Sequence, residues 1–430
     1  MPRYEAAFKS VAKNVAAHEK WFAESLPMIA SENVASRRVR EVLSSDLGHR
    51  YAEGWPGERV YAGCTYIDQI ELMAIDLGRK LFRAEFLDVR PTSGVVANLA
   101  VYSALSSPGD TMVALPIPNG GHISHGKKDF SGSAGLVHGL EIEYFAFDKE
   151  QMNIDVDGTK KRLKELGKPI KIAMFGGSLF LFPHPVKELA PALTEAGGTV
   201  CYDAAHVAGL IAGGAFQDPL REGAEVMTFS THKTLFGPQG GAIAATMKHA
   251  EDLKKGVFPG TTSSHHLNNV AAKAMTFAEF LQFGRVYARD VIRNAQTLAQ
   301  RLADLGEKVL GEKNGYTKSH QVAVDVTKYG DGGAMEKRLE EQNIIVNRQL
   351  IPGDLQAGRH YTNPGGIRLG VAELTRLGMG RGEMKEVAEI LHDAMSGKNQ
   401  RRTVTEIKAL RKGFQKVKYS FESSPAYFFR

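Results

Sequence analysis

Cysteine is scarce in this sequence of 430 residues: only Cys64 and Cys201 occur, and neither belongs to a CxxC or zinc-type spacing. Two such cysteines build no disulfide framework, so we expect a reducing, cytoplasmic environment. No apolar run approaches the roughly 20 residues that a membrane-spanning helix needs. Charged side chains interrupt the first twenty positions, which excludes the apolar segment of a secretory signal. These absences predict a soluble, complete chain with no membrane partner.

The sequence also lacks low-complexity segments and internal repeats, and its composition is that of an ordinary globular protein. Hydrophobic residues make up 43% of it and charged residues 24%. At roughly 150 residues per domain, the length suggests two or three domains.

Short apolar runs alternate with helical segments between about residues 67 and 240. This alternation predicts a mainly parallel sheet with helices on both faces. The expected strands are 111–115, 142–147, 170–175, 199–203, 225–230 and 241–246.

The remaining segments flank this sheet. Apolar side chains at three-to-four spacing in 8–28 predict an amphipathic N-terminal helix. After a long helix expected over 270–305, the C-terminal part mixes strands and helices; these are expected at 320–326, 344–347, 367–370, 383–396 and 403–416. We therefore expect an α/β protein with an N-terminal helical arm (1–45), a large sheet domain (46–275) and a smaller C-terminal α+β domain (276–430).

Two polar residues follow expected strands of the sheet, where ligands of open parallel sheets bind. Lys233 lies beside His232 after the run 225–230, and Asp203 ends the run 199–203. Taken alone, Lys233 is more often a solvated loop lysine. Together, a Schiff-base lysine and a carboxylate that faces a pyridinium nitrogen are typical of a pyridoxal phosphate site. Burial would lower the pKa of the lysine and make it a nucleophile.

A phosphate site is expected in 92-TSGVVAN-98, which places hydroxyl groups and a glycine at a predicted helix N-terminus. Without the other elements, this motif would be an ordinary helix cap.

His122 and His125 have HxxH spacing, but no third ligand lies near them and no HExxH motif occurs, so we expect no metal. A histidine in this glycine-flanked loop fits better as a ring stacked on a flat cofactor, and the pair His265 and His266 is likewise read as non-metal.

These pieces, in this order, resemble the serine hydroxymethyltransferases, pyridoxal phosphate enzymes of fold type I that exchange serine and glycine through a one-carbon carrier. The resemblance covers nearly the whole chain. Its most specific segments are 29-IASENVAS-36, 50-RYAEGWPGERVYAGC-64, 92-TSGVVANLAVY-102, 119-NGGHISHG-126, 202-YDAAHVAGLIAGG-214, 230-STHKTLFGPQGG-241 and 363-NPGGIRLGVAELTRLGM-379.

The resemblance implies where pyridoxal phosphate binds. Lys233 would hold it covalently, Asp203 would pair with its ring nitrogen, and His122 would stack on the ring. The other implied cofactor-binding residues are Ser93, Gly94, Ser178, His206, Ser230, Gly260, Ser263 and Ser264, with Thr231 as a catalytic neighbour of the lysine. His206 and Ser178 would lie near the phenolic oxygen of the ring.

The resemblance also implies how serine or glycine binds. Arg368 would bind the substrate carboxylate, assisted by Ser31. Tyr51, Glu53 and Tyr61 match residues that the family brings from the neighbouring subunit, which implies a homodimer with shared active sites. Glu53 is the candidate proton shuttle near the serine hydroxyl. The competing interpretation of Glu53 is a salt bridge to Arg50 or Arg59.

The sequence departs from the bacterial pattern in three places. Val95 replaces a second serine of the phosphate loop, and Val60 replaces the first of two adjacent tyrosines. The usual glycines after FPG are replaced in 258-FPGTTSSHH-266, where Thr262, Ser263 or Ser264 can still donate to the partner's phosphate. This pattern is similar to the archaeal branch and implies a reduced pterin carrier, either tetrahydrofolate or tetrahydromethanopterin, the latter favoured by the loss of the aromatic residue.

Three other functions compete with this interpretation. A threonine transaldolase or aldolase would use the same lysine and Arg368 on β-hydroxy amino acids. A nucleic-acid-binding protein is suggested by the pI of about 9.0, but no aromatic residues are interleaved with basic ones on a strand face. A catalytically dead relative would lack Lys233 or Asp203, and both are present.

The net charge of +6 arises from one segment. Residues 398–418 carry eight basic side chains and only one acidic side chain, Glu406. Because apolar residues recur there every three or four positions, we expect a C-terminal helix whose basic face is solvated. The rest of the chain is nearly neutral, so the charge does not indicate a nucleic-acid partner. The alternative is that the basic face of this helix attracts an acidic tail of the carrier.

Overall fold

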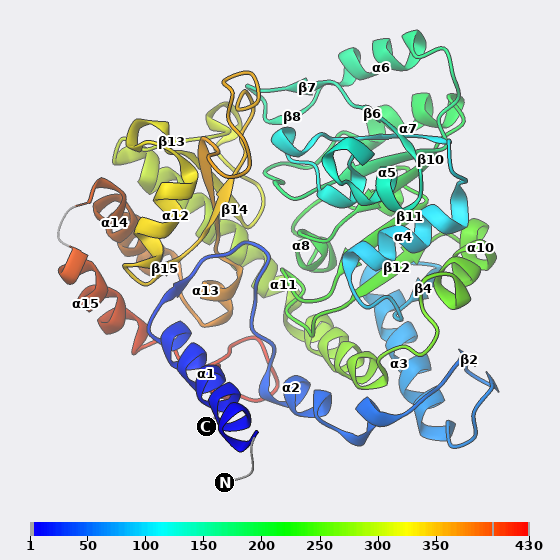
Figure 1. Ribbon diagram of the computed structural model, residues 1–430, viewed down its shortest axis with the longest axis horizontal. Coiled ribbons are helices and arrows are strands. Elements are labelled where there is room, and N and C mark those ends of the chain that lie inside the picture. The colour runs from blue at the N-terminus through cyan, green and yellow to red at the C-terminus, as the bar shows by residue number, and fades with distance from the viewer. Residues whose placement is uncertain (1–3, 398–399, 429–430) are drawn as a thin grey trace.

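The computed structural model describes residues 4–397 and 400–428, which form two sheet-containing bodies joined by one long helix (Figure 1). In the larger body, seven strands pair in the order β4-β12-β11-β10-β9-β5-β6. Their bounds are β4 (Phe86–Asp88), β5 (Thr111–Ala114), β6 (Glu141–Tyr144), β9 (Ile172–Gly176), β10 (Thr199–Asp203), β11 (Val226–Ser230) and β12 (Gly241–Ala245). Only β12 pairs antiparallel to its neighbours β11 and β4. The predicted α/β architecture with a mainly parallel sheet is confirmed, and so is the seven-stranded sheet of fold type I that the family resemblance implies.

All six expected runs of this sheet overlap one of its strands. No apolar run was assigned to the seventh strand, β4, because three residues are too short to show a period-two pattern.

Alternating residues of the strands face two separate cores, so both faces of the sheet are covered. Met112 and Met174 pack with helices α4 (Gly94–Leu105) and α10 (Ala250–Lys255) on one face. Val113 and Phe175 belong to the larger core on the other face, which includes residues of α3 (Thr65–Phe82) and α7 (Val186–Glu195). This arrangement leaves the strand ends as the accessible edge of the sheet.

The smaller body is built on a four-stranded antiparallel sheet of order β13-β14-β17-β16. Its strands are β13 (Lys308–Val309), β14 (Gln321–Asp325), β16 (Asn347–Gln349) and β17 (Gly366–Gly370). The helices of this body are α12 (Gly332–Glu340), α13 (Ala372–Arg376), α14 (Arg381–Ser396) and α15 (Gln400–Arg411). Helix α11 (Leu267–Asp304) packs against both α3 and α14, so the expected domain boundary at 275/276 falls inside one continuous helix.

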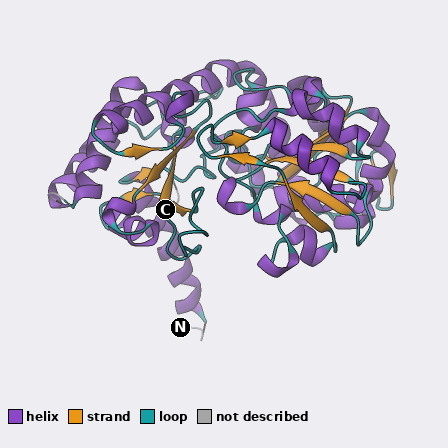
Figure 2. Cartoon of the chain, turned by 90° about the horizontal axis from the view of Figure 1, so that it is seen from above, coloured by secondary structure: helices purple, strands orange, loops and turns teal. Residues whose placement is uncertain are grey.

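The N-terminal helix α1 (Glu5–Ala23) is shorter than the predicted 8–28, because Leu26 lies in strand β1 (Leu26–Pro27), which pairs with β15 (Ile344–Ile345). Figure 2 shows α1 projecting from the body. Its apolar stripe is left open, with Phe8 78% and Val11 65% exposed. The first three residues of the expected arm lie outside the described residues.

The basic C-terminal segment differs from its prediction in two respects. Helix α15 ends at Arg411, and Arg411 is buried, where it donates to the carbonyl oxygens of Phe414 and Phe22. The other basic residues of the segment that the structure describes are exposed, whereas Lys398 lies outside the described residues. In 4–397 and 400–428, no helix combines the length and the hydropathy that crossing a membrane requires.

Candidate active site

Lys233 lies three residues after β11 and is buried, with 9% of its surface exposed. Burial lowers the pKa of Lys233 to about 8, opposed by the nearby charge of Asp203 and assisted by that of Arg368. A substantial share of the amine is therefore neutral near pH 8, as nucleophilic attack on an aldehyde requires. The structure brings together the three charged groups that were predicted from separate segments.

Asp203, the last residue of β10, accepts three hydrogen bonds. Asn98 Nδ2 and His125 Nε2 lie 2.8 and 2.9 Å from Oδ2, and the Ala205 backbone N–H donates to Oδ1 over 2.9 Å. Burial alone would raise the pKa of Asp203, but the hydrogen bond and charge of His125 hold it well below its usual value. Because each carboxylate oxygen can accept two hydrogen bonds, Oδ1 retains room for one more donor.

The partners of Asp203 were not predicted. Asn98 is fixed in turn by Thr228, whose hydroxyl donates to Asn98 Oδ1 over 2.6 Å, and Asn98 Nδ2 also lies 2.9 Å from Ser124 Oγ. His125, the second histidine of the HxxH pair, is fully buried against the carboxylate. Their only sequence signal was membership of the motifs 92–98 and 119–126.

His122 and His206 are neutral imidazoles beside these charged groups. Burial lowers the pKa of His122 to about 4 and that of His206 well below its usual value. Ser124 N–H donates to His122 Nδ1, so the ring proton of His122 sits on Nε2. An uncharged, partly exposed ring is the form that stacks on a flat cofactor without repelling its pyridinium.

Arg368, at the centre of β17, is 6% exposed. Its Nη1 donates to both the backbone oxygen and the hydroxyl of Ser178, over 2.6 and 2.8 Å, and its Nε to Asn347 Oδ1. Burial lowers the pKa of Arg368 to about 10, so it stays charged at neutral pH. No described residue accepts a hydrogen bond from Nη2, which leaves that edge of the guanidinium for a substrate carboxylate.

Ser31 is held close to the strand of Arg368. A Cβ on Gly370, two residues after Arg368, would lie 2.4 Å from Ala30 Cα, so only glycine permits this approach of the two segments. Asn33, which was not predicted, donates to the backbone oxygen of Lys233 over 2.7 Å. The motif 29–36 therefore contacts both the strand of Arg368 and the segment of Lys233.

A cradle for an anion lies at the N-terminus of α4. Ser93 caps the helix by accepting from Val96 N–H, and a Cβ on Gly94 would lie 2.6 Å from Ser230 Oγ. The buried Lys273 supports the loop that leads to Ser93 by donating to the backbone oxygens of Val89, Pro91 and Gly241. Free N–H groups of the helix and two hydroxyls thus converge on one point, which suits a phosphate.

Thr231 lies between Ser230 and Lys233, and its side chain has a turn-forming contact. Its hydroxyl donates to Pro238 O over 2.7 Å, and its backbone oxygen accepts from Gly237 N–H. The hydroxyl oxygen can still accept a proton donor, so the catalytic role expected for Thr231 stays a prediction.

Five of the expected residues gather elsewhere, on the surface. Glu53 accepts from Ser263 Oγ, and the rings of Tyr51 and Tyr61 lie 5.6 Å apart. A Cβ on Gly260 would lie 3.7 Å from Ser103 Oγ, near the C-terminal end of α4. Ten helical residues, about 15 Å, separate Ser103 from Ser93 at the other end of that helix.

Glu53 makes neither of the salt bridges considered for it. Arg50 pairs with Asp46, and Arg59 pairs with Asp68 and Glu71. The structural interpretation of Glu53 as an ion-pair partner of Arg50 or Arg59 is therefore wrong. Gly260 lies beside the end of α4 that is opposite the anion cradle, and Ser263 donates to Glu53.

The buried residues fit pyridoxal phosphate on three counts. Lys233 is a partly neutral buried amine, Asp203 Oδ1 retains an acceptor position, and Ser93, Gly94 and Ser230 form the cradle. In the part of the chain that the structure describes, no group of three or more His, Cys, Asp and Glu side chains is arranged to hold a metal ion.

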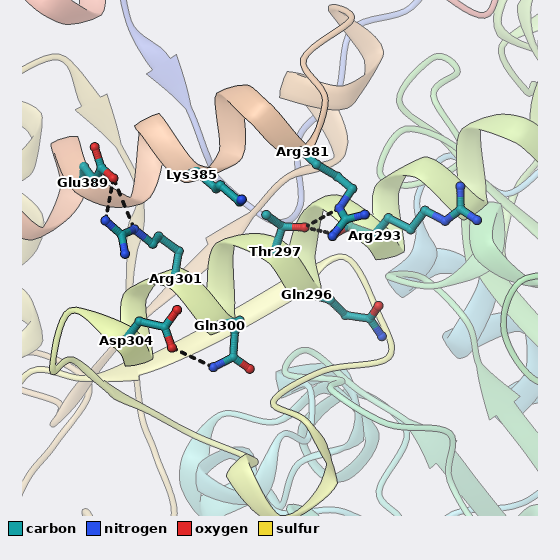
Figure 3. Close-up of a pocket in the computed structure, with 9 residues that line it drawn as sticks. All are labelled: Arg293, Gln296, Thr297, Gln300, Arg301, Asp304, Arg381, Lys385 and Glu389. Atoms are coloured by element: carbon teal, nitrogen blue, oxygen red, sulfur yellow. Dashed lines mark hydrogen bonds and ion pairs between the residues drawn. The ribbon is translucent and has the colours of Figure 1, made fainter.

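A hollow of about 710 Å³ lies elsewhere, between α11 and α14 (Figure 3). Arg301 there pairs with Glu389, and Arg381 donates to Thr297 Oγ1. None of the residues expected in the active site lines this hollow.

Comparisons with known proteins identify the family of this site. Residues 5–391 match the family described as serine hydroxymethyltransferase. The serine hydroxymethyltransferase of Cenarchaeum symbiosum is 63% identical over 415 residues, covering 95% of this chain and 94% of the relative. That of Nitrosopumilus maritimus is 62% identical over 410 residues, covering 94% and 93%.

Among solved structures, an L-threonine transaldolase from Pseudomonas fluorescens superposes with a TM-score of 0.85 at 30% identity, covering 97% of this chain and 93% of that one. The family match over nearly the whole sequence and the high identities to the archaeal relatives indicate the same family. The chain belongs to the serine hydroxymethyltransferase family, whose members are pyridoxal-phosphate-dependent transferases of fold type I.

Proposed function

We propose that this chain transfers the hydroxymethyl carbon of serine to a reduced pterin and returns glycine, reversibly. The observation that carries the proposal is the convergence of Lys233 and Asp203, at strand ends of the larger sheet, with Arg368 of the smaller sheet, where the pKa of Lys233 responds to both other charges. One amine, one carboxylate and one guanidinium there match the covalent link, the ring nitrogen and the substrate carboxylate of the reaction.

Each residue has a separable task. Pyridoxal phosphate bound here supplies an electron sink for charge that develops on the substrate Cα. Lys233 would hold its aldehyde carbon, the Asp203 carboxylate would keep its ring nitrogen protonated, and the cradle at α4 would hold its phosphate. Arg368 would fix the substrate carboxylate and thereby choose which bond to Cα stands perpendicular to the ring.

We further propose that two subunits share each active site. The surface group formed by Tyr51, Glu53, Tyr61 and Ser263 is exposed or half-buried, and among the described residues none of its members makes a hydrogen bond to Lys233. The open apolar stripe of α1 offers a second surface that a partner subunit would cover. In the assembled dimer, Glu53 of one subunit would move a proton at the serine hydroxyl in the site of the other.

The test of the cofactor assignment is the visible absorbance of the purified protein. We expect Lys233→Ala to abolish the band of the covalently held cofactor, whereas Lys248→Ala, at an exposed lysine paired with Glu225, leaves it unchanged. An unchanged band in Lys233→Ala would overturn the assignment of the covalent lysine.

The shared site is tested by mixing two inactive variants, Lys233→Ala and Glu53→Gln, under conditions that exchange subunits. In a mixed dimer, one of the two sites keeps both Lys233 and a partner glutamate, so roughly a quarter of the wild-type activity returns on random mixing. Without any recovery, Glu53 would have to act in its own subunit.

The carrier and the competing threonine transaldolase are separated by two assays. We expect serine cleavage to depend on an added reduced pterin, with a higher kcat/KM for tetrahydromethanopterin than for tetrahydrofolate, because Val60 offers no aromatic face to the aryl ring of the latter. Turnover with tetrahydrofolate that is equal or better contradicts the carrier assignment. Pterin-independent transfer from threonine to another aldehyde would favour the transaldolase.

A further inference from the structure

Gln321 connects the smaller body to the larger one at the active site. It is the first residue of β14 and is fully buried. Its side chain makes three hydrogen bonds to the larger body: Phe180 N–H donates to Oε1 over 2.6 Å, and Nε2 lies 2.9 Å from both Ser178 O and His206 Nδ1. No sequence motif singled out this residue.

The neighbours of the amide determine its orientation. The backbone N–H of Phe180 can only donate, so the side-chain oxygen of Gln321 must face it. The backbone oxygen of Ser178 can only accept, so the NH₂ group must face Ser178 and, with it, His206. Consequently His206 Nδ1 accepts a hydrogen bond, and the single proton of the neutral ring sits on Nε2.

The same carbonyl oxygen links Gln321 to the arginine. Ser178 O accepts from Gln321 Nε2 and also from Arg368 Nη1, over 2.6 Å. The two donors come from neighbouring strands, because β14 pairs with β17 so that Gln321 is opposite Gly370 and Ala323 opposite Arg368. A displacement of β14 would therefore disturb both His206 and the resting position of Arg368.

The ring of His206 is also held from its face. His320, the residue before Gln321, lies 5.7 Å from it at an interplanar angle of 20° and contacts Ala30 O through its own Nε2. The face of the ring is thus occupied by stacking and its Nδ1 by Gln321. Its Nε2–H is the polar group that remains for a ligand.

We propose that Gln321 is a positioning residue, which fixes His206 as the Nε2–H tautomer and thereby presents a hydrogen-bond donor to the bound cofactor. The assignment of the Nε2–H tautomer of His206 depends only on contacts within the protein. That the donor faces the cofactor ring rests on the proposed function. Gln321 would act through His206 and Ser178 and would touch neither substrate nor cofactor.

The first test is the tautomer of His206 in the cofactor-free protein, read from ¹⁵N shifts of the imidazole nitrogens and assigned by His206→Asn. In the wild type we expect the Nε2–H form. In Gln321→Glu, a carboxylate that cannot donate replaces the NH₂ group, so we expect His206 to place a proton on Nδ1. Gln349→Glu is the matched control, because Gln349 is also buried in this sheet, on β16, and its Nε2 contacts only Leu350 O.

The second test is the dissociation constant of pyridoxal phosphate, together with the separate effects on KM for serine and on kcat. Gln321→Met keeps a similar side-chain volume but removes the two N–H donors of the amide. We expect about tenfold weaker cofactor binding, as loss of one well-placed hydrogen bond produces. Because Met leaves Nδ1 unconstrained, a mixture of tautomers should accompany it. This variant also serves if Gln321→Glu does not fold.

An unchanged Nε2–H tautomer of His206 in Gln321→Glu or Gln321→Met would overturn the proposal. So would a change of the His206 ¹⁵N chemical shifts in Gln349→Glu that equals the change in Gln321→Glu. If the tautomer moves in the Gln321 variants while the wild type cleaves no serine, the positioning role stands and the proposed function fails.

Discussion

Two buried carboxylates, Glu71 and Asp203, have similar surroundings and opposite uses. Glu71 on α3 is 1% exposed and Asp203 is 3% exposed, and each contacts a histidine. The Glu71 cluster comprises Glu71, Arg59, Arg90 and His265; the Asp203 cluster comprises Asp203, Asn98, His125 and Thr228.

The two carboxylates differ in how many of their hydrogen-bond acceptor positions are occupied. Arg90 and Arg59 donate to Glu71, His265 lies 3.0 Å from it, and both of its oxygens have at least two neighbours. Although burial alone would raise it, the hydrogen bond from His265 and the charge of Arg90 lower the pKa of Glu71 to about 2. Asp203 instead retains an acceptor position at Oδ1. A lowered pKa is common to both residues, so it is the spare acceptor at Asp203 that distinguishes a ligand site from a structural ion cluster.

The Glu71 cluster nevertheless serves the proposed active site. Arg59 also donates to the backbone oxygens of Ala52 and Gly54, on either side of Glu53. His265 follows Ser263 and Ser264, so the cluster joins the two segments that we assign to the partner's site. Its role is to fix their shape.

The largest effect is expected for Glu71→Gln. The change leaves two arginines, Arg59 and Arg90, buried without their carboxylate, and we expect a loss of about 3–5 kcal/mol in the free energy of unfolding. Urea-induced unfolding at fixed protein concentration measures it. Glu41→Gln is the matched control, because Glu41 also pairs with two arginines, Arg37 and Arg38, but at the surface, where about 0–1 kcal/mol is expected. Equal losses in both variants would contradict the comparison.

Asp203→Asn should show the reverse pattern. The amide keeps the size of the side chain but removes the negative charge that would keep the ring nitrogen protonated, and we expect kcat to fall by about 10²–10³-fold. The fall in unfolding free energy should be smaller than in Glu71→Gln, since no arginine is left unpaired. Steady-state kinetics with serine and the same urea experiment provide both numbers. Full activity in Asp203→Asn would remove Asp203 from the site.

Acid should reduce the difference in stability between the wild type and Glu71→Gln. The pKa of Glu71 is about 2 in the folded chain and 4.5 when unperturbed, so its stabilisation is complete above pH 4.5 and is lost as the pH falls toward 2. Between pH 5 and pH 3, the wild type should therefore lose about 2 kcal/mol more than Glu71→Gln. Parallel stability curves of the two proteins over this range would show that Glu71 is not held ionised.

The comparison also shows what the sequence could predict. Lys233 and Asp203 each lie at the end of an apolar run, and parallel strands bring their ends to one edge of the sheet. The chemical role of both residues and their place at this edge could therefore be predicted from the sequence. The positions of Arg368, Glu53 and Ser263 came only from the family resemblance. Sheet, arm and long helix followed from periodicity, whereas β4 was too short to show any.

The supporting residues were not predictable, for a physical reason. Glu71 contacts His265 across 194 positions, and Gln321 contacts His206 across 115. Such contacts depend on how the two bodies and the surface loops pack, and no local period or spacing encodes that packing. Asn98 and His125 stood inside recognised motifs, but which side chain would meet Asp203 depended on the same packing.

The smallest effect is expected at the outer end of the Asp203 cluster. Thr228 lies beside Asp203 across the β10–β11 pair and donates its hydroxyl to Asn98 Oδ1. Thr228→Val keeps the shape and leaves that oxygen without its donor, so we expect a loss of about 1 kcal/mol in unfolding free energy and roughly fivefold in kcat. Thr276→Val is the control, because the Thr276 hydroxyl bonds only to Ala272 O within α11. If both variants lose stability but neither loses kcat, Thr228 contributes to packing alone, and the Asp203 cluster that supports catalysis ends at Asn98.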